Sequence, residues 1–292
     1  MVIRYGCVAI LSAVLVSAAS AQSVLRWKFH PGEQLHYTRT RDQTSAKTVA
    51  GVRTQDMIQA TTDMTLVVAE VADDHSAQMK LLIDRIRYRR KSNAGETHYD
   101  SSTDVAPAGT DAKFAANLKE LLGSEFLFHM SPRGEISGIR VGERSPKQPG
   151  ATPKPTSSNT ASSVRNLLPY FRLPEEAVAP GMTWPEQTEY LEPNLGLRRV
   201  DLTYQYVRQE LYSGRPVEKI TFTSDVRFTG LPRGKVIVDL KQNESRGTVY
   251  FDKAAGRLVM KEQKEKLSLT LLEESRRIED ETQSTVTVKL NP

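Results

Sequence analysis

Apolar and polar side chains alternate along most of the chain after residue 24, which is the pattern of β-strands with one buried face. The clearest stretch is 200–206, where Val200, Leu202, Tyr204 and Tyr206 take every second position. Similar alternation predicts further strands at 62–71, 77–89, 220–228, 236–240, 247–251, 257–271 and 282–290. Polar or glycine-containing segments at 72–76, 213–216 and 252–256 predict the turns between them. Long antiparallel runs of this kind indicate a meander, a sheet with one apolar face and one solvent-exposed face.

Two segments have the spacing of an amphipathic helix instead. In 111–123 the apolar side chains Phe114, Leu118, Leu121 and Leu122 fall on one helical stripe. In 162–171 the stripe is formed by Val164, Leu167, Leu168 and Phe171. Pro169 weakens this second helix beyond Leu168, because proline lacks the backbone N–H that a helix interior needs.

The segment 141–163 has four prolines, many small polar residues and almost no apolar side chain, and it reads as a linker. It separates two β-rich units, 22–140 and 164–292, that share long hairpins and a late turn closed by a glycine, Gly134 or Gly256. We therefore expect a mainly β protein with a minor α+β character. Its two related curved antiparallel sheets should each pack on one short amphipathic helix, because a one-sided apolar sheet must be covered.

Residues 1–21 have the features of a secretory signal peptide. Arg4 supplies a positive start, 7–19 is apolar but too short to span a bilayer, and Ala19-Ser20-Ala21 supplies a small-residue cleavage site before Gln22. The single cysteine, Cys7, lies inside the apolar stretch. We expect an exported, periplasmic or extracellular protein that, once cleaved, has no lipid anchor, no disulfide and no transmembrane anchor.

The formal net charge of +5 arises from 40 Lys and Arg residues interspersed with 35 Asp and Glu residues, which argues against a nucleic-acid partner. The strongest charge feature is Arg85, Arg87 and Arg89, which on a strand would project from one face. They either form a basic stripe that contacts an anionic partner or are a solvated strand face that opposes aggregation.

No catalytic or metal-binding motif stands out, so we predict neither an enzyme, nor a cofactor, nor a metal site. His30 and His36 flank Glu33 across a Pro-Gly turn, which does not ensure that three ligands converge. The acidic doublets 73–74, 175–176 and 273–274 would point to opposite faces of a strand or into water. The nucleophile-elbow, zinc-protease, phosphate-loop and dinucleotide motifs are all absent.

Aromatic side chains are concentrated on the predicted apolar face of the second unit. Tyr204, Tyr206, Phe222 and Phe228 would either line a cavity for a hydrophobic ligand or pack against a helix.

The chain resembles a family of exported bacterial proteins of uncharacterised function. The resemblance lies in Leu173-Pro174 followed by Val178, Pro180-Gly181 and Trp184, and in the opening Trp27-Lys28-Phe29 with Gly32-Glu33. More remotely, the turn Tyr250-Phe251-Asp252 with Gly256-Arg257-Leu258 is similar to the lipoprotein-carrier superfamily. That resemblance implies an open sheet wrapped around helices that shelters an acyl chain.

These observations leave three hypotheses. The first is an envelope protein that holds a hydrophobic or amphipathic ligand, such as a lipid, in a groove of a curved sheet. The second is a non-enzymatic scaffold protein that binds another envelope protein through strand edges and the basic stripe. The third is a hydrolase that brings His98 and His129 together with acidic residues.

Overall fold

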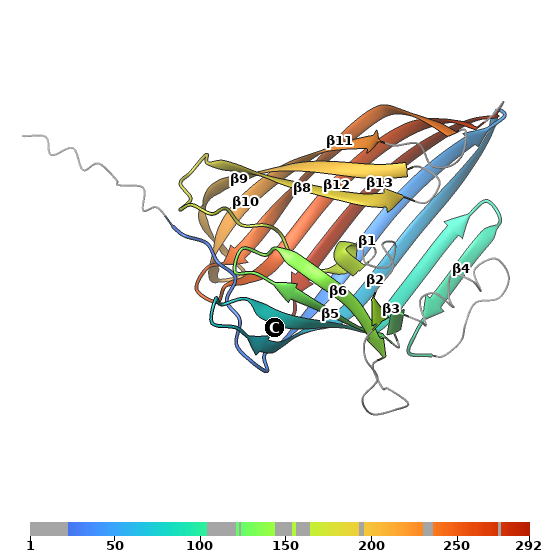
Figure 1. The fold of residues 1–292 in the computed structure, drawn as a ribbon. Helices are drawn as coiled ribbons and strands as arrows, with labels where there is room; N and C mark the ends of the chain where they lie inside the picture. Colours follow the sequence, from blue (N-terminus) through green and yellow to red (C-terminus); the bar gives the residue numbers. More distant parts are fainter. Residues whose placement is uncertain are drawn as a thin grey trace, which may run out of the picture.

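The described residues form thirteen strands, and all of them belong to one antiparallel sheet. Figure 1 shows its course. The computed structural model describes residues 23–103, 121–122, 124–143, 154–155, 164–192, 196–229, 236–273 and 276–292. The strands are β1 (Gln34–Val49), β2 (Val52–Val71), β3 (Ala77–Ser92), β4 (Gly95–Asp100), β5 (Ser124–Met130), β6 (Ile136–Glu143), β7 (Lys154–Pro155), β8 (Thr183–Glu192), β9 (Gly196–Tyr212), β10 (Arg215–Thr229), β11 (Val236–Asp252), β12 (Arg257–Glu273) and β13 (Arg276–Leu290). The mainly β prediction is confirmed. The strands continue beyond the alternating stretches into segments rich in polar and charged residues, such as 276–281 in β13.

The two predicted curved sheets are not confirmed, because the two halves of the chain form one continuous sheet. The strand order is β7-β6-β5-β3-β2-β1-β13-β12-β11-β10-β9-β8, with β4 beside β3. Each half is a meander, and the halves join where β1 pairs with β13 from Tyr37–Leu290 to Val49–Ile278. The physical reason is that two separate sheets would each leave a long inner strand with unpaired backbone groups, and the pairing of these strands removes both edges.

The sheet ends at two strands that carry proline. Pro185 lies in the edge strand β8, and Pro155 lies in the two-residue strand β7 at the other end. Proline is tolerated at an edge because it lacks the N–H that a central strand must donate. Both ends are therefore poor templates for pairing with another chain.

The sheet is strongly curved, and its concave face encloses part of the chain (Figure 1). Register shifts interrupt several pairings, among them Lys219/Ile220 in β10 and Tyr250/Phe251 in β11, and such bulges bend a sheet. The curvature is evident from Arg198 of β9, which lies 2.6 Å from Glu265 of β12 although two strands separate them in the sheet.

The core lies on the lower part of the concave face, beside the hairpin turns, and the segment 168–173 fills it. Phe171 is 1% exposed, and its ring contacts those of Trp27, Phe251 and Tyr204 at centroid distances of 5.8, 5.6 and 5.9 Å. The Trp27 indole donates a hydrogen bond to the Phe171 carbonyl at 3.3 Å. The Trp184 indole donates to the next carbonyl, that of Arg172, at 2.8 Å. Both tryptophans thus hold this segment inside the curve.

The two glycine-closed hairpin turns hold the N-terminal segment between the halves. Gly134 and Gly256 have φ values of +84° and +64°, as their turns require. The backbone N–H of Trp27 donates to the Pro132 carbonyl at 2.8 Å, and that of Lys28 donates to the Gly256 carbonyl at 3.0 Å. One strand-like segment therefore bridges both halves at the base of the sheet.

One of the predicted helices is described, as a short helical turn at 164–167 inside the curve of the sheet (Figure 1). Its last helical residue is Leu167, two positions before Pro169. Of the predicted helix 111–123, only Leu121 and Leu122 are described; they are helical and pack against the core. Of the predicted linker, 141–143 belongs to β6 and 154–155 is β7, while its other residues and the predicted signal 1–21 lie outside the described residues.

Candidate ligand-binding site on the concave face

A cavity of about 310 Å³, called here the inner cavity, lies on the concave face above the aromatic core. Its apolar walls come from β9, β13 and the segment 168–171, and include Val200, Leu202, Val286 and Val288. Its charged lining consists of Arg39, Arg41, Arg165, Arg198, Lys261, Glu186 and Glu265. The lining thus has three more positive than negative formal charges, which is unusual for a half-buried site.

The sheet register places two of these cations in one row. Arg39 of β1 and Lys261 of β12 are both direct cross-strand partners of Val288 on β13. Direct partners in antiparallel strands point to the same face, so both side chains flank Val288 on the concave side. Because neighbouring strands are about 4.8 Å apart, the two Cα atoms are separated by about 10 Å.

Both carboxylates of the inner cavity already have partners. Glu265 forms the 2.6 Å ion pair with Arg198. Glu186 is 9% exposed and accepts hydrogen bonds from the Tyr204 hydroxyl at 2.9 Å and the Arg172 backbone N–H at 3.4 Å. The nearby Glu186 charge and this hydrogen bond, together with burial as the largest cause, raise the pKa of Tyr204 well above its usual value. The phenol therefore stays a neutral donor.

Arg39 and Lys261 have no carboxylate partner among the described residues. Nε of Arg39 is buried without a hydrogen bond in this part of the chain, and burial together with the neighbouring charge of Arg41 lowers the pKa of Arg39 to about 10. Nζ of Lys261 donates to the Tyr170 carbonyl at 3.3 Å and lies 5.4 Å from the centre of the Phe222 ring. Burial is the main cause that lowers the pKa of Lys261; the nearby Glu186 charge opposes this shift, and Arg39 adds to it. Two positive charges are thus partly desolvated side by side.

The concave face is apolar again on the far side of the inner cavity. Along β12, Leu267, Leu269 and Leu271 share a face with Lys261. Neighbouring strands add Val238 and Leu240, the cross-strand partners of Leu271 and Leu269. On β10, Val226 and Phe228 continue the face of Phe222. We call these seven residues the upper apolar face; Val226 and Leu269 are buried and the other five are half-buried.

The aromatic residues predicted to line a ligand site are divided between the core and this face. Tyr204 is 1% exposed, stacks on Trp184 and lines the inner cavity. Phe222 is buried, and Tyr206 is buried with its hydroxyl donating to Glu218 at 2.7 Å. Phe228 lies on the upper apolar face. A ligand contact remains a prediction for all four.

The cations of the inner cavity were missed by the analysis of motifs, although a signal was present. Arg39 and Arg41 follow Leu35 and Tyr37 at the same alternating positions, so the pattern places them on the buried face. Charged residues at core positions are exceptional unless paired or functional. No sequence pattern connects them with Lys261, which lies more than 200 residues away in the chain.

Arg85, Arg87 and Arg89 do lie on one face, but each has an acidic neighbour. Arg85 forms a bidentate pair with Asp100, Arg87 lies 3.0 Å from Asp63, and Arg89 lies 2.7 Å from Glu96. The hydrogen bond from Arg85 is the largest cause that holds the pKa of Asp100 well below its usual range. Contact with an anionic partner stays a prediction, and such a partner would compete with these carboxylates.

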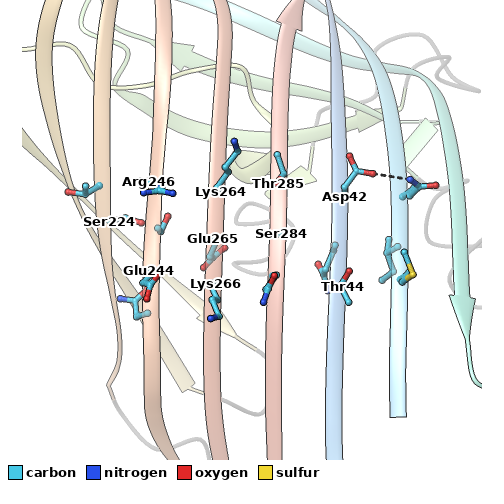
Figure 2. Close-up of a pocket in the computed structure, with 18 residues that line it drawn as sticks. Asp42, Thr44, Ser224, Glu244, Arg246, Lys264, Glu265, Lys266, Ser284 and Thr285 are labelled. Carbon is cyan, nitrogen blue, oxygen red and sulfur yellow. Dashed lines mark hydrogen bonds between the residues drawn. The ribbon is translucent and has the colours of Figure 1, made fainter. Parts of the chain in front are cut away.

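A second hollow, of about 750 Å³, is a polar trough at mid-height of the sheet (Figure 2). Its labelled side chains come from the neighbouring strands β10, β11, β12, β13 and β1, and the adjacent residues Lys264, Glu265 and Lys266 all line it. Adjacent strand residues point to opposite faces of the sheet, so residues from both faces line this hollow. It is therefore a surface depression and not an enclosed cavity. Met57 and Ile58 are its apolar lining residues, which makes it a poor site for a hydrophobic ligand.

The histidines are not part of a metal-binding group in the described part of the chain, and His98 pairs with Glu96 at 2.6 Å. No group of three or more His, Cys, Asp or Glu residues there is arranged to hold a metal ion. Glu33 pairs with Arg257 at 2.8 Å, and His36 shares a hydrogen bond with Thr65. His98 and His129 pair with β3 opposite residues 89 and 78, which places them about 36 Å apart along the strand. The described ranges also contain no helix that is long and apolar enough to cross a membrane.

Comparison with known proteins shows a similarity of fold. No protein-family model and no curated protein sequence matches the chain. A solved structure of lipovitellin, whose subject is lipid–protein interactions, superposes with a TM-score of 0.53 at 14% sequence identity. The match covers 91% of this chain and 26% of lipovitellin, so the chain spans about a quarter of that protein. The curved open sheet implied by the lipoprotein-carrier resemblance is thus confirmed as a fold.

Two further structures match across most of this chain with low TM-scores. A Bacteroides fragilis protein with a YmcC-like fold matches at 10% identity and a TM-score of 0.28, covering 92% of this chain and all of that protein. A β-barrel-like protein of a domain of unknown function from Brucella abortus matches at 9% identity and a TM-score of 0.19, covering 93% of this chain and all of that protein.

Proposed function

We propose that this chain is an exported envelope protein that binds a hydrophobic or amphipathic ligand on the concave face of its sheet. The observation that carries the proposal is the upper apolar face, which continues from the inner cavity beyond the packed core. The buried cluster that contains Phe171 and Trp27 does not include Leu269 or Val226. Apolar surface on a concave face, next to a few convergent polar groups, is typical of small-molecule sites.

The fold shared with lipovitellin supports this proposal at the level of architecture. The solved lipovitellin structure concerns lipid–protein interactions, and about a quarter of that protein superposes on this chain. Fold similarity by itself does not establish a ligand, so the argument depends on the residues of the concave face.

Placing a charge on the upper apolar face should weaken binding of a neutral acyl probe. The probe is the methyl ester of pyrenedodecanoic acid, and its fluorescence reports binding to the purified full chain. The substitution Leu267→Glu, at a half-buried position, should reduce its affinity by roughly tenfold or more, because a carboxylate on the groove wall must be desolvated. Lys266→Glu, at the neighbouring exposed position, is the matched control and should change little. Equal effects of the two substitutions, or no binding to the unaltered protein, would contradict the proposal.

Export is tested separately. Protein recovered from the envelope of the producing bacterium should begin at Gln22, and replacing Ala19 and Ala21 with bulky residues should block cleavage. Recovery of protein that still begins with Met1 would argue against a cleaved signal.

A further inference from the structure

We infer that the ligand of the concave face is an anionic amphiphile, an acyl or alkyl chain that ends in a carboxylate or phosphate, and that its headgroup lies between Arg39 and Lys261. This inference rests on the proposed function and specifies the ligand class of the same site. Arginine and lysine both recognise these oxyanions through charge-assisted hydrogen bonds.

The first argument is the unbalanced charge of the inner cavity. Its two carboxylates are engaged, Glu265 with Arg198 and Glu186 with the Tyr204 hydroxyl and the Arg172 backbone. Arg39 has no ion pair in the described part of the chain, and Lys261 has a carbonyl partner. Glu186 acts on Lys261 as a nearby negative charge, and no carboxylate pairs with Arg39 in the described residues, so the two half-buried cations are only partly neutralised. Incompletely neutralised charge away from water is costly, and an anion that enters between these two side chains lowers that cost.

The second argument is the position of this pair of cations. Arg39 and Lys261 flank Val288 in one row, and a single oxyanion above Val288 can be reached from both sides. The same face of β12 then passes Gln263 and Glu265 before it becomes apolar at Leu267. A ligand whose headgroup lies between Arg39 and Lys261 and whose tail lies on the upper apolar face therefore matches the order of polar and apolar residues along β12.

The third argument is size. The inner cavity of about 310 Å³ is at the lower limit of pockets that enclose a small molecule, which are roughly 300–1,000 Å³. It holds a headgroup and the first methylene groups, and a longer chain has to continue along the concave face. The inner cavity therefore fits a single-chain amphiphile better than a compact hydrophobic molecule.

The test compares three probes with the same pyrene-labelled chain: pyrenedodecanoic acid, its methyl ester and the corresponding alkyl phosphate. Fluorescence titration of the full chain should show that at least one anionic probe binds about tenfold or more tightly than the neutral ester. The headgroup that binds more tightly identifies carboxylate or phosphate as the preferred oxyanion. The double substitution Arg39→Met and Lys261→Met should abolish this preference while leaving ester binding within about twofold, because methionine keeps the apolar stem.

Three controls separate the possible outcomes. Arg39→Lys should retain the preference, and Arg227→Met, which removes an arginine that is 64% exposed and paired with Asp225, should not alter it. The melting temperature of the double variant should stay close to that of the unaltered protein, because the removal of two poorly neutralised charges offsets the loss of the hydrogen bond from Lys261 to the Tyr170 carbonyl. Equal binding of acid, phosphate and ester overturns this inference and leaves the proposed function intact, whereas failure of all three probes to bind overturns both. A preference that survives the double substitution overturns the assignment to Arg39 and Lys261.

Discussion

Replacing Phe171 with alanine is expected to lower the free energy of unfolding by about 3–5 kcal/mol. The ring is 1% exposed and lies at the centre of the core, against Trp27, Phe251 and Tyr204. The residue belongs to the internal segment that both tryptophan indoles hold by hydrogen bonds to its backbone. Its removal leaves a cavity that the rigid sheet cannot collapse to fill. Urea unfolding followed by tryptophan fluorescence measures the loss.

Met57→Ala is a suitable control for this experiment, because Met57 is 52% exposed on β2. Its effect should stay within about 0.5 kcal/mol. A loss below about 1 kcal/mol for Phe171→Ala would mean that the segment 168–173 does not fill the core as described.

Alanine at Gly134 is expected to destabilise the protein by about 3 kcal/mol. A Cβ there would lie 2.7 Å from Nε1 of Trp27 and would collide with the Phe171 carbonyl, so it disrupts the hydrogen bond between these two groups. The φ value of +84° adds the strain of a left-handed conformation for a residue with a side chain. Overpacking costs about 1–3 kcal/mol and the backbone strain about 1–2 kcal/mol.

Gly181 provides the matched control, since its φ value is +86° and nothing lies within 4 Å of its Cβ position. Gly181→Ala should therefore show the strain alone, about 1–2 kcal/mol in the same unfolding experiment. If both substitutions cost the same, the close contact of the 131–135 turn with Trp27 does not contribute to stability.

The sequence predicted many of the strands and turns, because both depend on local chemistry, although it did not predict β1 or β8. Alternation at 200–206 and 220–228 reappears in β9 and β10, and the turn at 252–256 joins β11 and β12 with a positive φ at Gly256. Pro169 correctly limited the helical turn, whose last residue is Leu167. These features are set by residues within a few positions of each other.

The single sheet could not be predicted in the same way. Alternation shows which face of a strand is buried but not which strand lies at its edge, and the β1–β13 pairing joins residues about 250 positions apart. The separation by a proline-rich segment therefore pointed to two sheets, although the inner strands of both halves complete each other. The same limit applies to Arg39 and Lys261, which share a row only because of this pairing.

The pairing of β1 with β13 has a consequence for the way the chain reaches its final form. The backbone groups on one side of β1 stay unsatisfied until β13 and Asn291 have been made, since the Asn291 N–H still donates to the His36 carbonyl at 2.8 Å. The sheet can therefore close only after β13 has been synthesised, and such long-range closure is intrinsically slow. During that delay β1 is an exposed edge that invites aggregation, which a holding chaperone would prevent.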